Sequence, residues 1–297
     1  MAFRLAKDLA LPDDAATQKL AVLGRSSSGK TYLAGKLVEL LLEAKRQVVV
    51  LDPVGVWWGL RLAADGKGKG LDVPILGGPH GDVPLEATGG ALVADVTVDK
   101  AASLVLDVSE LTGGEMRRFV TEFAVRLLHR KKRARSPVLV VWEEAQDFVP
   151  QRVFADAARM VGAVERLVKQ GRNFGVGTLL ISQRPQSVNK DVLNQTEALF
   201  VFQLTGPQER KAVEGWIVEK ALDRSALELL PSLKQGDGLV WSPTWLQTFQ
   251  SVRALPKRTY DASATPTFDT KAAAEPGTTF GVPVAASQRT SDSFQNQ

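Results

Sequence analysis

The segment Gly24-Arg25-Ser26-Ser27-Ser28-Gly29-Lys30-Thr31 most constrains what this chain can fold into, because it matches the pattern G-x-x-x-x-G-K-[ST]. An apolar run over 20–23 leads into it, and an amphipathic pattern over 31–44 follows. A strand, a glycine-rich turn and a helix in this order point backbone N–H groups and a helix N-terminus at an anion. The pattern predicts a polyphosphate site in which Lys30 reaches the β- and γ-phosphates and Thr31 holds Mg²⁺. The alternative is a glycine–serine turn with a chance Lys-Thr, which the flanking strand and helix patterns disfavour.

Short apolar runs alternate with helical patterns through most of the chain. The expected strands cover 19–23, 47–51, 73–76, 103–107, 138–141, 178–181 and 198–202, and the expected helices cover 31–44, 115–130, 154–169, 207–214 and 220–229. This alternation predicts an α/β fold with a mostly parallel sheet and helices on both faces. The runs 239–241 and 246–252 add a short antiparallel extension at the C-terminal side.

Composition divides the chain into three parts. Residues 1–17 form a polar lead-in, 18–255 form one domain, and 256–297 are rich in Ala, Thr, Ser, Pro and Gln, which predicts a disordered tail. The absence of cysteine excludes disulfides and thiolate metal sites. Neither a signal-peptide pattern nor an apolar run of membrane-spanning length is present, so we expect a cytoplasmic protein with no membrane contact.

Two adjacent acids follow the apolar run 138–141. At the carboxyl end of a strand beside a phosphate loop, Glu143 is suited to hold Mg²⁺ and Glu144 to orient and deprotonate the attacking water. The alternative is a helix N-terminus carrying acids, which the helix dipole also favours. Gln183 follows the next strand, where it could contact the γ-phosphate; ordinary loop chemistry before Pro185 is its alternative.

Three segments together resemble the HerA/FtsK superfamily of RecA-like P-loop translocase ATPases, and HerA-type proteins in particular. They are 24–31, 138–144 and 171–185, with weaker similarity at 52–55, 81–85 and 204–210. The resemblance implies an Mg²⁺-dependent ATPase that forms hexameric rings with the nucleotide between subunits. An arginine from the neighbouring subunit then completes the site, and Arg172, followed by Arg184, is the candidate. For Arg172 the alternative is a cap on the preceding helix.

The chain departs from the family pattern at three places. Glu143 stands where the family usually has Asp, and Val56 stands where an acid is common. The 17 residues before the domain leave no room for the small β-barrel that usually precedes a HerA-type core, so we expect a stripped-down motor domain.

A basic run, Arg130, Lys131, Lys132, Arg133 and Arg135, offers possible contacts to DNA phosphates. A solvated helix end is the alternative, since basic residues suit the C-terminal dipole. A net charge of +4 is compatible with a polyanionic partner without proving one.

The leading hypothesis is therefore an oligomeric ATPase that moves along DNA or packages it, with a nuclease or another protein as a further partner. A small-molecule kinase stays possible, although it would leave the segment 171–185 unexplained. Two further alternatives stay open. One is an ATPase that remodels or assembles a protein, and the other is a nucleotide-dependent switch. A GTPase is disfavoured because the guanine-reading pattern Asn-Lys-x-Asp is absent.

Overall fold

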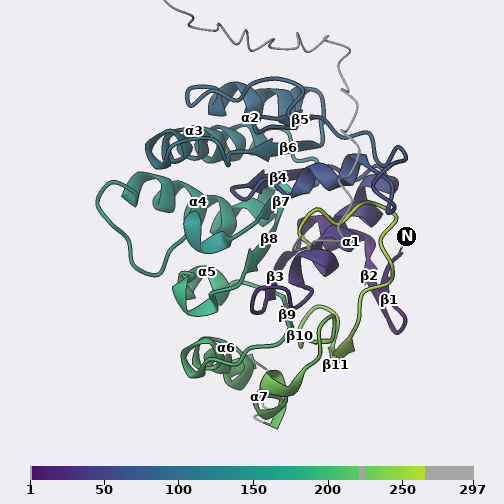
Figure 1. Ribbon diagram of the computed structural model, residues 1–297. Coiled ribbons are helices and arrows are strands. Elements are labelled where there is room, and N and C mark those ends of the chain that lie inside the picture. The colour runs from purple at the N-terminus through teal and green to yellow at the C-terminus, as the bar shows by residue number, and fades with distance from the viewer. Residues whose placement is uncertain (1, 221–224, 265–297) are drawn as a thin grey trace, which may run out of the picture.

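The computed structural model describes residues 2–220 and 225–264 (Figure 1). Their strands are β1 (Ala2–Ala6), β2 (Leu9–Pro12), β3 (Lys19–Leu23), β4 (Val48–Asp52), β5 (Ile75–Leu76), β6 (Leu104–Asp107), β7 (Val138–Trp142), β8 (Val176–Ser182), β9 (Ala198–Val201), β10 (Gly238–Ser242) and β11 (Thr248–Val252). Their α-helices are α1 (Lys30–Glu43), α2 (Gly90–Asp99), α3 (Gly113–Lys131), α4 (Ala158–Gln170), α5 (Lys190–Leu193), α6 (Pro207–Lys220) and α7 (Ser225–Leu229). Short 3₁₀ helices are η1 (Asp13–Thr17), η2 (Trp57–Arg61), η3 (Ala145–Asp147), η4 (Gly171–Phe174), η5 (Pro185–Ser187) and η6 (Leu230–Ser232).

One large sheet organises the fold. Its strand order is β11-β10-β9-β3-β8-β7-β4-β6-β5, and the strands from β9 to β5 pair in parallel. β10 runs antiparallel to both of its neighbours, which confirms the antiparallel extension predicted at the C-terminal side. The carboxyl ends of β3, β7 and β8 lie side by side at one edge, because these strands are adjacent in the order.

Both faces of the sheet are covered, as its continuous apolar strands require. Along β3, Leu20 and Val22 face one core cluster, whereas Ala21 and Leu23 face the other. The first cluster includes α1 and the β1–β2 hairpin, and the second includes α2, α3, α4 and α6. Figure 1 shows α3–α6 on one side of the strands and α1 with the hairpin on the other.

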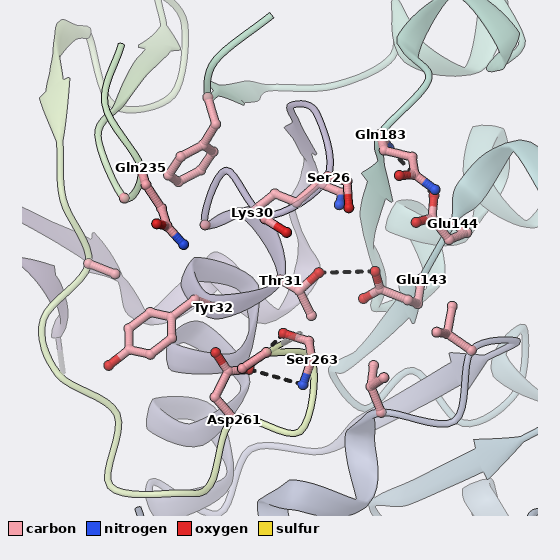
Figure 2. A pocket seen from close by; sticks show the side chains of 18 of the residues that line it. Ser26, Lys30, Thr31, Tyr32, Glu143, Glu144, Gln183, Gln235, Asp261 and Ser263 are labelled. Atoms are coloured by element: carbon pink, nitrogen blue, oxygen red, sulfur yellow. Dashed lines mark hydrogen bonds between the residues drawn. The ribbon is translucent and has the colours of Figure 1, made fainter. Parts of the chain in front are cut away.

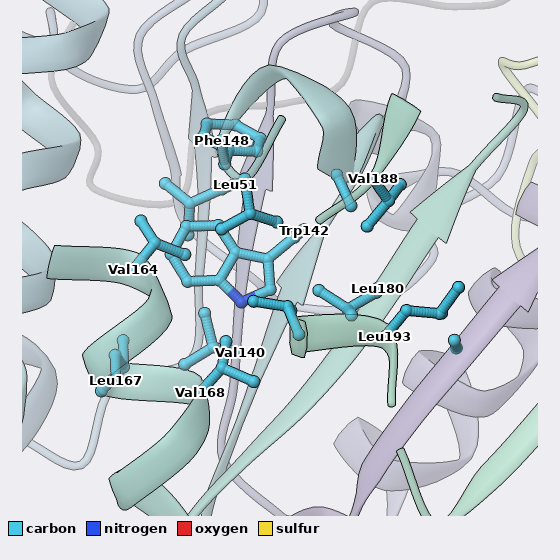
Figure 3. Packing of buried hydrophobic residues seen from close by; sticks show 14 of the residues in the cluster. Leu51, Val140, Trp142, Phe148, Val164, Leu167, Val168, Leu180, Val188 and Leu193 are labelled. Carbon is cyan, nitrogen blue, oxygen red and sulfur yellow. The ribbon is translucent and has the colours of Figure 1, made fainter. Parts of the chain in front are cut away.

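Trp142 fixes the end of β7, immediately before the two acids. Its indole is fully buried, and its ring centroid lies 5.3 Å from that of Phe148. Side chains of α4 and β8, including Val164, Leu167 and Leu180, surround it (Figure 3). The close packing of this large ring restrains the backbone that carries Glu143 and Glu144.

The N-terminal residues differ from the expected lead-in. Ala2–Ala6 and Leu9–Pro12 form an antiparallel hairpin whose Leu5 and Leu11 are fully buried. The backbone N–H of Leu255 donates to Leu5 O, so the hairpin is also attached to the C-terminal part of the chain. The alternation of apolar and polar residues is only four or five residues long in each strand, which is too short to stand out in a charged segment.

Residues 257–264, which we call the C-terminal strap, also differ from expectation. Their composition predicts that they belong to the disordered tail, but Thr259 is 3% exposed and its backbone N–H donates to the buried carboxylate of Glu39. The rest of that tail, 265–297, lies outside the described residues. α2 is a further element, since none of the expected helices covers Gly90–Asp99.

Within the described ranges, no helix combines the length and apolar character that a membrane crossing requires.

Candidate nucleotide-binding site

The loop 24–29 has the backbone geometry that a phosphate cradle needs. Gly29 adopts a left-handed conformation (φ 106°) directly before α1, which favours glycine. Gly24 lies so close to Ser28 and Phe202 that a Cβ would approach Ser28 Oγ to 2.6 Å. The loop is attached to neighbouring strand ends, because Gly24 N donates to Ser182 O and Arg25 N donates to Gln203 O. The first turn of α1 then places Lys30 and Thr31 at the helix N-terminus.

A cavity of about 920 Å³ opens over this loop. It is lined by eight of the residues singled out from the sequence: Ser26, Ser27, Gly29, Lys30, Thr31, Glu143, Glu144 and Gln183. Figure 2 shows Thr31 and Glu143 facing each other, with Glu144 and Gln183 beside them. Three separate strand ends thus deliver these side chains to one place. Of the remaining loop residues, Ser28 is buried and Arg25 is exposed.

Glu143 lies between the loop and the sheet. Thr31 Oγ1 donates to its Oε1 over 3.2 Å, and Trp57 Nε1 donates to its Oε2 over 3.0 Å. Its burial raises the pKa of Glu143 to about 8; the nearby Asp52 carboxylate also raises this pKa, whereas the Lys30 ammonium opposes the shift. A cation placed beside these oxygens would restore the ionised carboxylate, since an adjacent positive charge favours the charged form.

Glu144 occupies a strained position in the next turn. Its backbone is left-handed (φ 49°), which is rare for a residue other than glycine and is frequent at functional sites. Gln146 Nε2 donates to Glu144 Oε2 over 2.8 Å, and Ser182 Oγ donates to Gln146 Oε1 over 2.6 Å. Gln146 therefore connects the Glu144 carboxylate to the end of β8, where Gln183 follows.

The other half of the cavity comes from residues that were not predicted to belong to the site. They are Tyr32, Val54, Val56, Phe202, Gln235, Gly236, Arg253, Ala254, Asp261, Ser263 and Ala264. Figure 2 shows Asp261 and Ser263 of the C-terminal strap close to Thr31 in this view. The place of Tyr32 in the cavity could have been predicted from the sequence, because this residue directly follows Thr31 of the motif. The C-terminal residues have no comparable signal, since only the folded chain brings them to the loop.

The two candidate arginines lie outside this lining. Arg172 belongs to η4, before the amino end of β8, and its guanidinium pairs with Glu197 at 2.8 Å. Gln183 follows the carboxyl end of the same seven-residue strand, so roughly 20 Å separates the two strand ends. Arg184 follows Gln183 and lies near Asp147. Burial raises the pKa of Asp147, and the positive charge of Arg184 opposes this shift.

The basic run is less available than the sequence suggested. Lys131 is 1% exposed and donates to Ser136 O, so its proposed contact with DNA phosphates is wrong. Arg130 pairs with both Asp95 and Asp99. Lys132 and Arg135 flank the ring of Phe174, with charges 6.0 and 5.5 Å from its centroid, and Lys132, Arg133 and Arg135 are exposed. These three remain as candidate contacts.

Comparison with known proteins supports the resemblance. The family model described as "Helicase HerA, central domain" matches residues 9–127. The DNA double-strand break repair helicase HerA of Pyrococcus furiosus is 32% identical over 104 residues, which cover 35% of this chain and 18% of that protein. A probable HerA of Methanocaldococcus jannaschii is 29% identical over 149 residues, which cover 50% of this chain and 28% of that protein. The matches thus span less than a third of either relative.

Solved structures share the fold. The genome packaging NTPase B204 of Sulfolobus turreted icosahedral virus 2, in complex with sulfate, superposes with a TM-score of 0.55 at 16% identity and covers 82% of this chain and 98% of its own. The bacterial conjugative coupling protein TrwB gives a TM-score of 0.58 at 10% identity and covers 87% and 91%. At these identities the likeness shows the fold alone. Residues 9–127 are therefore similar to the central domain of HerA helicases, and the fold is that of the P-loop ATPases among these solved structures.

Proposed function

We propose that the chain binds ATP with Mg²⁺ in the 920 Å³ cavity and hydrolyses it to drive movement of DNA. The observation that carries this proposal is the contact between Thr31 Oγ1 and Glu143 Oε1, with Lys30, Glu144 and Gln183 around the same cavity. This set combines a phosphate-binding cation, an oxygen pair suited to a divalent ion and an acid for the attacking water.

The residues present fit Mg²⁺. The ion prefers oxygen ligands and is usually held by one or two carboxylates together with substrate phosphates. The Thr31 hydroxyl and the Glu143 carboxylate supply two such oxygens, and they already contact each other. When bound there, Mg²⁺ would neutralise negative charge on the β- and γ-phosphates.

Each side chain then has a defined task in our proposal. Lys30, which is 6% exposed, places its ammonium against the β- and γ-phosphates, where burial strengthens its electrostatic field. Glu144 accepts a proton from the attacking water, and Gln146 holds the Glu144 carboxylate in orientation. Gln183 donates to the γ-phosphate and is positioned to respond to its loss.

The proposals that the chain acts on DNA and forms an oligomer are based on the proteins that it resembles. HerA proteins are named as DNA double-strand break repair helicases and B204 as a genome packaging NTPase. We therefore propose a homo-oligomer, with a hexameric ring favoured, in which a neighbour's Arg172 completes the nucleotide site. The exposed Lys132, Arg133 and Arg135 are the proposed phosphate contacts.

The test is ATP hydrolysis by the assembled protein with and without DNA over a range of salt concentrations. We expect DNA to stimulate turnover, and we expect Lys30→Ala and Glu144→Gln to abolish it. Lys30→Ala should also weaken ATP binding, whereas Glu144→Gln should retain it, because in our proposal Lys30 binds the phosphates of ATP before the reaction and Glu144 acts on the attacking water. Equal turnover with and without DNA would refute the DNA motor. Stimulation by a protein would instead favour a remodelling ATPase, and tight binding without turnover a switch.

A further inference from the structure

Trp57 makes a contact that the proposed reaction does not yet explain. It lies in η2, after β4, and its indole N–H donates to Glu143 Oε2 over 3.0 Å. The side chain is 4% exposed, so this N–H faces the acid in a water-poor environment. When a cation beside Glu143 restores its ionised form, a hydrogen bond to that carboxylate is stronger than one between neutral groups.

We infer that Trp57 is a positioning residue for Mg²⁺ binding, because its indole N–H holds Glu143 Oε2 and leaves Glu143 Oε1 facing Thr31. This inference rests on the proposed ATPase function and adds a residue to it. The indole can only donate, so it occupies one oxygen and cannot compete for the metal. A carboxylate held at one oxygen has little freedom to rotate its other oxygen away from the cation.

The neighbouring strand end builds this arrangement. Asp52 ends β4, and its fully buried carboxylate accepts four backbone N–H groups, from Val54, Gly55, Val56 and Trp57, at 2.7–3.0 Å. These bonds fold the segment after β4 into one tight turn. β4 pairs with β7, and Glu143 N donates to Leu51 O. The turn and the acid are therefore attached to the same pair of strands.

Simple core packing is the competing explanation for Trp57. Packing accounts for a buried ring, but it does not require that the only polar atom of that ring meets the carboxylate that also contacts Thr31. The two explanations differ in what they predict for a ring that lacks the N–H. Phenylalanine fills most of the same space and removes the donor, so Trp57→Phe separates them.

Trp58 provides the matched control. It also carries an indole and directly follows Trp57, but its ring packs at a tilt of 31° against that of His80 (4.2 Å between centroids) and contacts Tyr260. Trp58→Phe therefore removes the indole N–H of the neighbouring residue and leaves the hydrogen bond between Trp57 and Glu143 in place. Comparing the two variants tests the contact rather than the loss of tryptophan.

The experiment measures binding of the fluorescent analogue mant-ATP to the full chain, in EDTA and in graded Mg²⁺. For Trp57→Phe we expect an affinity in EDTA within about twofold of the native value, and an Mg²⁺ concentration for half-maximal tightening that rises about tenfold or more. The Mg²⁺ concentration for half-maximal ATP hydrolysis should rise in parallel, whereas kcat at saturating Mg²⁺ should change little. Trp58→Phe should behave like the native protein in every measurement, and Trp57→His, which keeps a ring N–H, should recover part of the loss.

A second readout does not depend on turnover. The chain has six tryptophans, so ¹⁵N-tryptophan labelling gives six indole signals, and the one missing in Trp57→Phe belongs to Trp57. We expect this signal to shift when Mg²⁺ is added to the nucleotide complex of the native protein. If Trp57→Phe does not fold, assignment through Trp57→His keeps this measurement available.

Three results would overturn the inference. One is equal behaviour of Trp57→Phe and Trp58→Phe, another is an equal loss of affinity in EDTA and in Mg²⁺, and the third is an indole signal of Trp57 that ignores Mg²⁺. Failure of the proposed function itself looks different, because the native protein would then show neither Mg²⁺-dependent mant-ATP binding nor hydrolysis.

Discussion

At the scale of single residues, the site separates side chains that meet the nucleotide from those that hold them in place. Gln146 belongs to the second group, because it bridges Glu144 Oε2 and Ser182 Oγ. A carboxylate that orients water loses effectiveness when its own direction is free, since a misplacement of about 1 Å can reduce turnover by about 100-fold.

We expect Gln146→Leu, which keeps the size of the side chain but removes both hydrogen bonds, to reduce kcat by about 10- to 100-fold. Binding of mant-ATP should change by less than about twofold, because Gln146 does not line the cavity. The measurement is steady-state ATP hydrolysis beside equilibrium binding, and Gln186→Leu, in η5 after β8, is the control. An unchanged kcat would show that Glu144 needs no such support.

The sequence was most informative at this scale. The loop and Glu143, Glu144 and Gln183 are brought into one cavity because each follows a strand, and parallel neighbouring strands end at the same edge. Trp57 and Gln146 could not be found this way. Their importance depends on the direction of one N–H group, which a pattern of residue types does not specify.

At the scale of elements, the C-terminal strap and α1 form one unit. Glu39 of α1 is fully buried and accepts from Lys36 and from the strap residues Arg258 and Thr259. The absence of a side chain at Gly35 gives Lys257 room, since a Cβ there would lie 3.1 Å from its Nζ. A helix face with a buried acid and a glycine has no apolar stripe, so no hydrophobic pattern indicates that another segment packs on it.

Removing the buried acceptor should therefore loosen the strap. We expect Glu39→Ala to lower the free energy of unfolding by about 3 kcal/mol or more, because it leaves a buried lysine and several donors without a partner. Glu43→Ala is the control, since Glu43 pairs with a mostly exposed Arg258 and should cost less than about 1 kcal/mol. Chemical denaturation measures both, and hydrogen exchange should accelerate in 257–264 only for Glu39→Ala. Similar losses in the two variants would contradict this account of the strap.

The basic run after α3 makes a second prediction about an element, because only part of it is exposed. Burial lowers the pKa of Lys131 from its ordinary value of 10.5 to about 8. Between these values the unfolded chain binds more protons than the folded chain, so the stability contributed by this residue rises with pH through that window.

Relative to Lys131→Gln, the native protein should gain about 1–2 kcal/mol of stability between pH 7.5 and pH 10. Lys132→Gln, which removes an exposed charge, should show no such pH-dependent difference. The two variants should also differ in DNA binding. Lys132→Gln should weaken DNA binding and reduce its salt dependence, whereas Lys131→Gln should not. Denaturation curves at the two pH values and DNA titrations at several salt concentrations provide the data.

At the scale of the whole molecule, the sheet has two chemically different edges. The cavity lies at the carboxyl ends of the parallel strands. Arg172 lies at the amino end of β8, near the exposed basic side chains around Phe174. The roughly 20 Å between the ends of β8 keeps Arg172 away from its own chain's phosphates. In a head-to-tail ring, however, the surface of one subunit faces a different surface of the next. The proposed role of Arg172 therefore requires a neighbour.

This requirement can be tested by mixing two inactive variants. Lys30→Ala lacks a working phosphate site but keeps Arg172, and Arg172→Ala has the opposite defect. If Arg172 acts across subunits, mixed assemblies contain intact sites formed by the Lys30 of one chain and the Arg172 of the next. When the two variants are mixed in equal amounts, about one site in four has both residues. ATP hydrolysis should therefore return to about a quarter of the native rate. The same mixture made with Arg184→Ala should stay inactive if Arg184 serves the cavity of its own chain, because no neighbour can then replace it. Failure of the Arg172 mixture to recover activity, in assemblies shown by native mass spectrometry to contain both chains, would rule out the shared site.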